Sequence, residues 1–564
     1  MPRFFFLIIL ITAIFISHPV KAQVNGVTLI GHLDKPHGVS TPPYYFKYSA
    51  CWGWVSPTGM EYALISVDSG TSIIDLNGDS LREAQFIPGP LSGAIWREMK
   101  TYKNYAYIVS EGGAGVQIVD LSGLPDTAVL VKNFIYAPLV PPDSGKSNTR
   151  SHTVTIADGY LYCNGSQTWI PGGATIFSLR EDPTNPSYVG KYEPEYLHDI
   201  YVRNDTLYGA AIAVGGGLYI ADVRDKANPV QLGKISYSQS GTHNAWASID
   251  GHYAFTTDEV NALKKDMKVW ALDSLPKSVM VTEYAGDPAS IVHNVFGRGN
   301  YVYVAHYTAG MRVVDVHDPR NLVEVGYYDT YPGPSGGYNG CWGAYPYFPS
   351  GKWIGSDMQT GLYVCRFDGL KPRVRSRLLE PPDSSSTFSG QFRWTSAADQ
   401  SEDPHYYELH LKGAAVDSIY TTRDTSFTPP PFVPGDGGGQ FTWFVMIRDE
   451  FTEVSSVDTF HFAITPTAVV GEKTMPASFF LQQNYPNPFN PMTTIEFTLD
   501  KSSIVTLLVA DVLGSEIKML LKDEPLGSGR HEVMFDASDL PSGTYFYTIT
   551  TPEIHVTKKM VLSR

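Results

Sequence analysis

The sequence predicts an all-β protein, with a seven-bladed β-propeller followed by two immunoglobulin-like β-sandwich domains. Its 564 residues are 13% aromatic and 18% charged and include 35 Tyr, 51 Gly and 40 Pro, a composition that favours strands and turns over long helices. A unit recurs about every 44 to 56 residues between residues 24 and 370, which is the length of a four-stranded propeller blade. After it, short strands alternate with turns of Pro, Gly and Asp, as in small β-sandwiches.

The chain opens with a segment typical of a secretory signal. Arg3 precedes an apolar run of about 13 residues from Phe4 to Ile16, which is too short to span a bilayer comfortably. Residues 20–22 suit a cleavage site, so we expect residues 1–22 to be removed and the mature chain to start at Gln23. No later stretch is apolar enough to span a membrane, so we expect no transmembrane segment after cleavage and an oxidising environment for the mature chain.

The charge balance excludes one class of partner. The chain has 42 basic and 57 acidic side chains, a net charge of −15, and it contains no long run of like charges. Because nucleic acids are bound through positively charged surfaces, we expect no nucleic-acid partner.

The repeat in residues 23–370 is clearest in its third strand. Residues 115–120, 217–222 and 310–315 share a Gly turn, a largely apolar strand and a final Asp that is suited to bond the amides of the following turn. Weaker copies at residues 70–75, 173–179, 268–273 and 361–366 bring the number of blades to seven. A Tyr-rich strand precedes each copy and an outer strand follows six of them.

The seventh blade lacks an outer strand downstream. Residues 26–31 at the chain start have the outer-strand pattern, so we expect them to complete blade seven and close the ring.

The two regions after the propeller read as sandwiches. Residues 371–466 carry short strands, such as residues 406–411 and 441–446, and resemble a fibronectin type III module that serves as a spacer or, as the less favoured alternative, as an adhesive arm. We expect a linker over residues 467–475 and a second sandwich over residues 476–564.

Motifs in residues 476–564 resemble the C-terminal sorting domain of type IX secretion. They are the Pro-rich opening at 484–491, the Val-Leu-Gly turn at 512–514, the Pro-Ser-Gly-Thr-Tyr segment at 541–545 and the Lys-Lys-Met-Val-Leu ending at 558–562. The resemblance implies that the type IX secretion machinery is a partner. It also implies that the protein passes through the periplasm and is secreted or held at the outer-membrane surface.

The propeller repeats resemble LVIVD repeats, with the Val-x-Ile-Val-Asp strand as the main match. The order of signal, propeller and sorting domain is similar to that of the choice-of-anchor B family, which adds little about chemistry because that family is defined by its architecture.

Two sets of polar residues are expected at one mouth of the propeller channel. Aligning the blades on their second strands puts one residue of each inner strand at the same height: Cys51, Arg97, His152, His198, His243, His293 and Cys341. The ends of the second strands share that side and add Asp68, Glu111, Asn164, Asp258, His306 and Asp357. Propellers bind ligands at such a mouth, so we expect Arg97, Glu111, Asp258, His306 and Asp357 to contact the ligand.

The four histidines leave two interpretations open. Neutral imidazoles that converge from four strands are suited to bind zinc, copper or iron, which makes His152, His198, His243 and His293 candidate metal ligands. Alternatively, each His bonds the backbone or hydroxyls of the next blade as a structural link.

Cys51 and Cys341 lie in Cys-Trp-Gly sequences of blades one and seven, which become neighbours when the ring closes. They are a disulfide candidate, with free buried thiols as the alternative, whereas Cys163 and Cys365 are expected to be unpaired.

Two functions follow from these features. The first is a secreted or cell-surface binding protein that holds an unknown extracellular ligand or protein on the propeller. The second is an extracellular metal-dependent enzyme, oxidative or hydrolytic, that uses the His-lined mouth. The first is favoured because the sequence shows neither a nucleophile-base pair nor a compact metal motif, and because the layout resembles that of a displayed module.

Overall fold

The computed structural model describes the chain as two compact units, residues 1–466 and 467–564. Placement is described for residues 24–562 except 41, 43–44, 91–93, 170, 261–263, 371–372, 387, 389, 398–403, 414–415, 430–438, 465–479, 483, 485–486, 488, 500, 511–515, 539, 542 and 553–554. The signal predicted at 1–22, the linker predicted at 467–475 and the turn predicted at 512–514 lie outside these residues.

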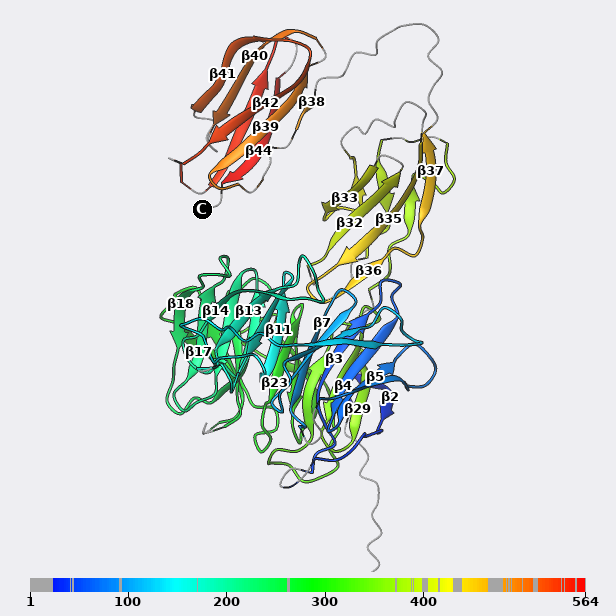
Figure 1. Cartoon of the computed structure of the whole chain (residues 1–564), viewed down its shortest axis with the longest axis vertical. Helices are drawn as coiled ribbons and strands as arrows, with labels where there is room; N and C mark the ends of the chain where they lie inside the picture. The colour runs from blue at the N-terminus through cyan, green and yellow to red at the C-terminus, as the bar shows by residue number, and fades with distance from the viewer. Residues whose placement is uncertain are drawn as a thin grey trace, which may run out of the picture. The chain divides into compact units, whose positions relative to one another are not determined.

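Every regular element in the described residues is a β-strand (Figure 1). This agrees with the all-β prediction, and the described residues contain no helix that is long and apolar enough to cross a membrane.

Residues 24–370 form antiparallel sheets of four strands in which each strand pairs with the next in the chain. The strands of the first three sheets are β3 (Tyr48–Val55), β4 (Glu61–Val67), β5 (Gly70–Asp75) and β6 (Arg82–Pro88); β7 (Arg97–Tyr102), β8 (Tyr105–Ser110), β9 (Val116–Asp120) and β10 (Val129–Phe134); β11 (Thr153–Ala157), β12 (Tyr160–Asn164), β13 (Ala174–Ser178) and β14 (Ser187–Tyr192). The strands of the next three are β15 (Asp199–Arg203), β16 (Thr206–Ala211), β17 (Gly217–Asp222) and β18 (Val230–Ile235); β19 (Thr242–Ala247), β20 (Tyr253–Asp258), β21 (Met267–Ala271) and β22 (Val279–Tyr284); β23 (Asn294–Arg298), β24 (Tyr301–His306), β25 (Gly310–Asp315) and β26 (Val323–Tyr328).

The last sheet joins the start of this region to its end. β27 (Cys341–Tyr345), β28 (Lys352–Asp357) and β29 (Gly361–Phe367) are completed by β2 (Val27–Leu33), which runs antiparallel to β29 (Figure 1). The pairing predicted for residues 26–31 is therefore confirmed. An additional short strand, β1 (Val24–Asn25), pairs with β26 and extends the preceding sheet.

The first strands of the sheets surround a common axis. β3 contacts β7, and the contacts continue in chain order through β11, β15, β19 and β23 to β27, which contacts β3 again. All residues of β3 are buried, whereas the outer strand β10 is largely exposed. Burial therefore falls from the axis outward, and sheets of four strands arranged in this way fit the blades of a propeller.

The Asp at the end of the three clearest repeat strands caps the following turn as predicted. The carboxylates of Asp120, Asp222 and Asp315 accept hydrogen bonds at 2.8–2.9 Å from the backbone N–H two residues later. This local contact explains why the repeat pattern is readable in the sequence.

The rest of the first unit forms two further sheets around one apolar core. One sheet contains β30 (Leu378–Glu380), β31 (Phe392–Trp394) and β34 (Ser426–Phe427); the other contains β32 (Tyr406–Gly413), β33 (Val416–Thr422), β35 (Gly439–Arg448), β36 (Glu453–Ser455) and β37 (Phe460–Ile464). Trp394, Tyr407 and Trp443 lie in the core that both sheets share.

The second unit also contains two sheets. They are built from β38 (Phe480–Leu481), β39 (Met492–Leu499) and β42 (Gly529–Asp536), and from β40 (Ser503–Ala510), β41 (Glu516–Leu526), β43 (Gly543–Thr550) and β44 (His555–Leu562). Asn484 of the predicted motif is buried, where its backbone N–H donates to the Tyr547 hydroxyl at 2.9 Å.

Cys51 and Cys341, the disulfide candidate, are free and buried in the structure, which matches the alternative of free buried thiols. Cys341 faces the core beside Met311 and Tyr363, whereas Cys51 belongs to the core that contains Trp342 and Ile354. The two thiols thus belong to cores on opposite faces of the last sheet. Burial raises the pKa of the Cys51 thiol to about 12, which keeps it protonated and unreactive.

Candidate functional site

Four histidines from four neighbouring sheets meet at one end of the channel. Their ring centroids are 3.8 Å apart for His152 and His198, 4.3 Å for His198 and His243, and 4.2 Å for His243 and His293. All four side chains are buried, and the exposed fraction of the residues falls from 9% at His152 to 0% at His293. The sequence alignment of the blades therefore placed these four residues at the same height.

Tryptophans occupy the positions next to the histidines in this ring. Trp342 lies 4.3 Å from His293 between ring centroids and stacks on Trp96 at 4.5 Å. A β-bulge interrupts the pairing between Cys341 and Gly343 and places Trp342 in the ring.

Trp342 and Trp96 therefore lie where the alignment had put Cys341 and Arg97, and these two predicted ring positions were wrong. Arg97 lies instead between the first two sheets, where its guanidinium approaches the Asp68 carbonyl at 3.5 Å.

The Nδ1 atoms of three histidines are held by acceptors on neighbouring residues. Nδ1 of His243 donates to the His293 carbonyl at 3.1 Å, and Nδ1 of His293 donates to the Trp342 carbonyl at 2.6 Å. Nδ1 of His152 lies 2.6 Å from the Glu111 carboxylate. These contacts agree with the alternative in which each His bonds the next blade as a structural link. They use only Nδ1, so the Nε2 atoms of His243 and His293 remain for a ligand.

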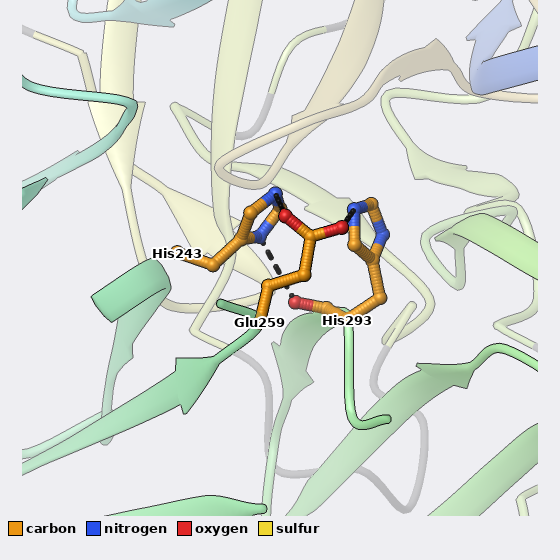
Figure 2. A group of neighbouring side chains, drawn as sticks. All are labelled: His243, Glu259 and His293. Atoms are coloured by element: carbon orange, nitrogen blue, oxygen red, sulfur yellow. Dashed lines mark hydrogen bonds and ion pairs between the residues drawn. The ribbon is translucent and has the colours of Figure 1, made fainter. Parts of the chain in front are cut away.

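Glu259 lies between two of the imidazoles (Figure 2). Its Oε2 is 3.5 Å from Nε2 of His243 and its Oε1 is 3.8 Å from Nε2 of His293. The Tyr307 hydroxyl donates to Oε1 at 2.5 Å, and the Tyr307 ring stacks on His293 at 4.6 Å. One donor atom from each of His243, Glu259 and His293 lies within 4.8 Å of the others, a spacing that suits a metal ion.

Burial determines the protonation states of the histidines at this end of the channel. It lowers the pKa of His243 below the usual value, and it lowers the pKa values of His198 and His293 further, with the neighbouring imidazoles adding to the effect. These three residues are therefore neutral at pH 7. Burial also opposes the charge on His152, but the hydrogen bond and charge of Glu111 outweigh it and raise the pKa of His152.

Three residues predicted to contact a ligand at this end have other partners. The Asp258 carboxylate binds Lys268 Nζ at 2.8 Å and the Tyr237 hydroxyl at 2.7 Å. Asp357 accepts hydrogen bonds from the Thr330 hydroxyl and from two backbone amides of its own turn. His306 is fully buried against Gly286 and Tyr284, and burial lowers its pKa to about 3.

For Asp258 and His306 the prediction was wrong by one position in the sequence. Glu111, which does reach His152, lies six positions after Tyr105 at the start of β8. The same spacing from Tyr253 and Tyr301 gives Glu259 and Tyr307, whereas Asp258 and His306 lie at five positions and face the other side. Counting six positions from the opening Tyr was the signal that could have identified both missed residues.

Charged and polar side chains follow the ring residues along the inner strands. Lys100 Nζ is 3.6 Å from Glu98 and 4.1 Å from the centroid of the Trp52 ring, and Asn244 donates to Asp199 at 2.6 Å. Burial raises the pKa of Glu98.

Aromatic side chains fill the opposite end of the same strands. Trp246 stacks on Tyr201 at 3.8 Å and lies 5.6 Å from Phe296, and Trp52 lies 4.9 Å from Tyr345. These residues come from five different sheets, so this end of the channel is packed with rings.

A turn from the module after the propeller covers this aromatic end. Phe451 stacks on Tyr347 at 3.8 Å, and the Tyr201 hydroxyl donates to Glu450 at 2.6 Å. Both the backbone N–H and the hydroxyl of Ser455 donate to the Pro57 carbonyl. A cavity of about 550 Å³ lies beside this contact, between the propeller and the module.

Two segments of the chain match known families. Residues 483–563 match the secretion system C-terminal sorting domain, and residues 291–330 match the LVIVD repeat. The sorting domain belongs to type IX secretion and indicates secretion or attachment to the outer-membrane surface. Comparison with curated proteins gives no match.

Two solved structures are similar over most of their own length. The β-propeller domain of Cps50 (Swd1) from Myceliophteria thermophila has a TM-score of 0.40 and 11% identity over 60% of this chain and 98% of that chain. The hydrazine synthase of Kuenenia stuttgartiensis has a TM-score of 0.42 and 11% identity over 60% of this chain and 99% of that chain.

Proposed function

We propose that the chain is a secreted or cell-surface binding protein, exported by type IX secretion, whose ligand binds at the histidine-lined end of a seven-bladed propeller. The module over residues 371–466 is an immunoglobulin-like sandwich of the fibronectin type III kind that covers the other end, and the layout is that of the choice-of-anchor B family. The observation that carries the proposal is the meeting of His152, His198, His243 and His293 at one end of the channel.

The chemistry of this end restricts the ligand. Neutral imidazole Nε2 atoms and the carboxylates of Glu111 and Glu259 all accept hydrogen bonds or bind cations. A ligand that donates hydrogen bonds or carries positive charge therefore suits this end, and an anion does not.

Native mass spectrometry tests this proposal. The protein collected from the medium of the producing cells is compared with the double variant His198→Ala/His293→Ala. We expect a bound mass on the wild-type chain that is absent from the variant, while circular dichroism at neutral pH shows that both chains are folded. Bare chain masses for both proteins would contradict the proposal.

A second candidate function is an extracellular metal-dependent enzyme, oxidative or hydrolytic. It is favoured by the cluster of His243, Glu259 and His293, because three protein ligands with a free coordination position are typical of catalytic metal sites. If this function is correct, added Zn²⁺, Cu²⁺ or Fe²⁺ will produce turnover of an ester, peptide or phenol probe that Glu259→Gln abolishes.

A further inference from the structure

We propose that His243, Glu259 and His293 bind one divalent transition-metal ion, Zn²⁺ or an ion of similar chemistry. The inference rests on the function proposed above, because it assigns the metal to the same end of the channel. Five independent features of the residues support it.

The first feature is the spacing of the donor atoms. In a tetrahedral zinc site with nitrogen and oxygen ligands, neighbouring donors are about 3.4 Å apart. The Glu259 oxygens lie 3.5 Å from Nε2 of His243 and 3.8 Å from Nε2 of His293. One donor atom from each of the three residues lies within 4.8 Å of the others, so the donors must approach one another by up to about 1.4 Å to share one ion.

The second feature is the tautomer of the two imidazoles. A backbone carbonyl only accepts hydrogen bonds, so the contacts of His243 and His293 with the next carbonyls require a proton on each Nδ1. In a neutral imidazole this leaves the lone pair on Nε2, which is the arrangement of histidines that ligate metals.

The third feature is an unsatisfied nitrogen. His293 is fully buried, and among the described residues its Nε2 has no hydrogen-bond partner. A buried polar atom without a partner costs free energy, and a metal ion at Nε2 removes that cost.

The fourth feature is an uncompensated negative charge. Glu259 is largely buried, and in the described part of the chain it forms no ion pair with a lysine or arginine. A divalent cation balances the carboxylate and leaves a net positive centre, as in other sites with two imidazoles and one carboxylate.

The fifth feature is the support of the carboxylate. The Tyr307 hydroxyl holds Glu259 Oε1 while the ring of Tyr307 packs on His293. Tyr307 is therefore a positioning residue that fixes two of the three ligands relative to each other.

The test uses the mature full-length chain without a polyhistidine tag, stripped with a chelator and titrated with Co²⁺ and then with Zn²⁺ as competitor. We expect one ion per chain, with the intense visible absorption of four- or five-coordinate Co²⁺ that Zn²⁺ displaces. Glu259→Gln and His293→Gln are expected to weaken binding at least about 100-fold, and Tyr307→Phe about 10-fold with a shifted Co²⁺ spectrum. His252→Gln, which removes an exposed histidine paired with Asp273, serves as the matched control and is expected to bind like the wild type.

A wild-type chain that binds no stoichiometric Co²⁺ or Zn²⁺ overturns the inference even if the variants fail to fold. Unchanged affinity in folded Glu259→Gln and His293→Gln chains overturns the assignment of the site. In either case a bound mass seen by native mass spectrometry keeps the binding function, so the two proposals fail separately.

Discussion

The two ends of the channel are built from the same inner strands but have opposite chemistry. His243 and Trp246 belong to one strand, β19, and His293 lies just before β23, which carries Phe296. The aromatic end is packed with rings and covered by Phe451. At the histidine end, within the described residues, Nε2 of His293 has no hydrogen-bond partner and Glu259 pairs with no lysine or arginine. Packed apolar rings stabilise a fold, and unsatisfied polar groups destabilise it unless a ligand uses them. The comparison teaches that the aromatic end is built for stability, whereas the histidine end keeps polar groups that the proposed ligand would use.

Deleting residues 24–33 is expected to have the largest effect because it removes the strand that completes the last sheet of the ring. The deletion removes β2, which supplies the outer strand of the last sheet and buries Val27. We expect a loss of about 4 kcal/mol or more in the free energy of unfolding, measured by urea denaturation. Replacing the exposed Leu29 and Ile30 with Ser keeps the backbone pairing and serves as control. A deletion variant that melts like the parent would refute the closure.

Truncating a ring at the aromatic end comes next in size. Trp246→Ala is expected to cost about 3–5 kcal/mol because it removes the stack on Tyr201 and leaves a cavity. His198→Ala at the other end is expected to cost about 1 kcal/mol in metal-free buffer. Denaturation of the two variants side by side measures the difference, and equal costs would break the comparison between the ends.

A pH-dependent contribution is expected from His152 at the histidine end. Its folded pKa is raised, so the pair with Glu111 stabilises the fold fully below the unfolded pKa of His and loses that contribution as pH rises through the folded pKa. The wild type is therefore expected to exceed His152→Gln in stability by about 1 kcal/mol or less at pH 5, with the difference shrinking toward pH 9. Melting temperatures across this range measure it. A difference that grows with pH would contradict the assigned partner.

The smallest effect is expected from reduction. Cys51 and Cys341 are free thiols on different faces of the last sheet, so dithiothreitol is expected to leave the melting temperature of the exported protein unchanged. A clear fall on reduction would mean that the two thiols pair after export.

Local signals explain what the sequence could predict. The repeat strands and the Asp caps at Asp120, Asp222 and Asp315 depend on contacts within two residues, so their pattern is visible without coordinates. The alignment also placed the four histidines correctly, because each sits near the start of an inner strand. The closing strand was predictable because the seventh repeat lacks an outer strand, whereas an unpaired outer-strand pattern precedes the first repeat.

Register explains what the sequence could not predict. Asp258 and Glu259 are adjacent acidic residues at the end of one strand, and their side chains point to opposite sides. As a result Asp258 binds Lys268 and Glu259 reaches His243. The bulge that puts Trp342 rather than Cys341 in the ring is likewise a property of the pairing with β28. The contact of Phe451 with Tyr347 joins residues about 100 positions apart and has no local pattern.

The pairing of Val27 with Phe367 determines when the ring of sheets can close during folding. Residues 27–33 are made before the first complete sheet, and their partner β29 is the last strand of residues 24–370 to be made. Until β29 is made, β2 has no partner and the ring of sheets stays open. Closing the ring is therefore a late step, and a chain cut short before β29 cannot form this pairing.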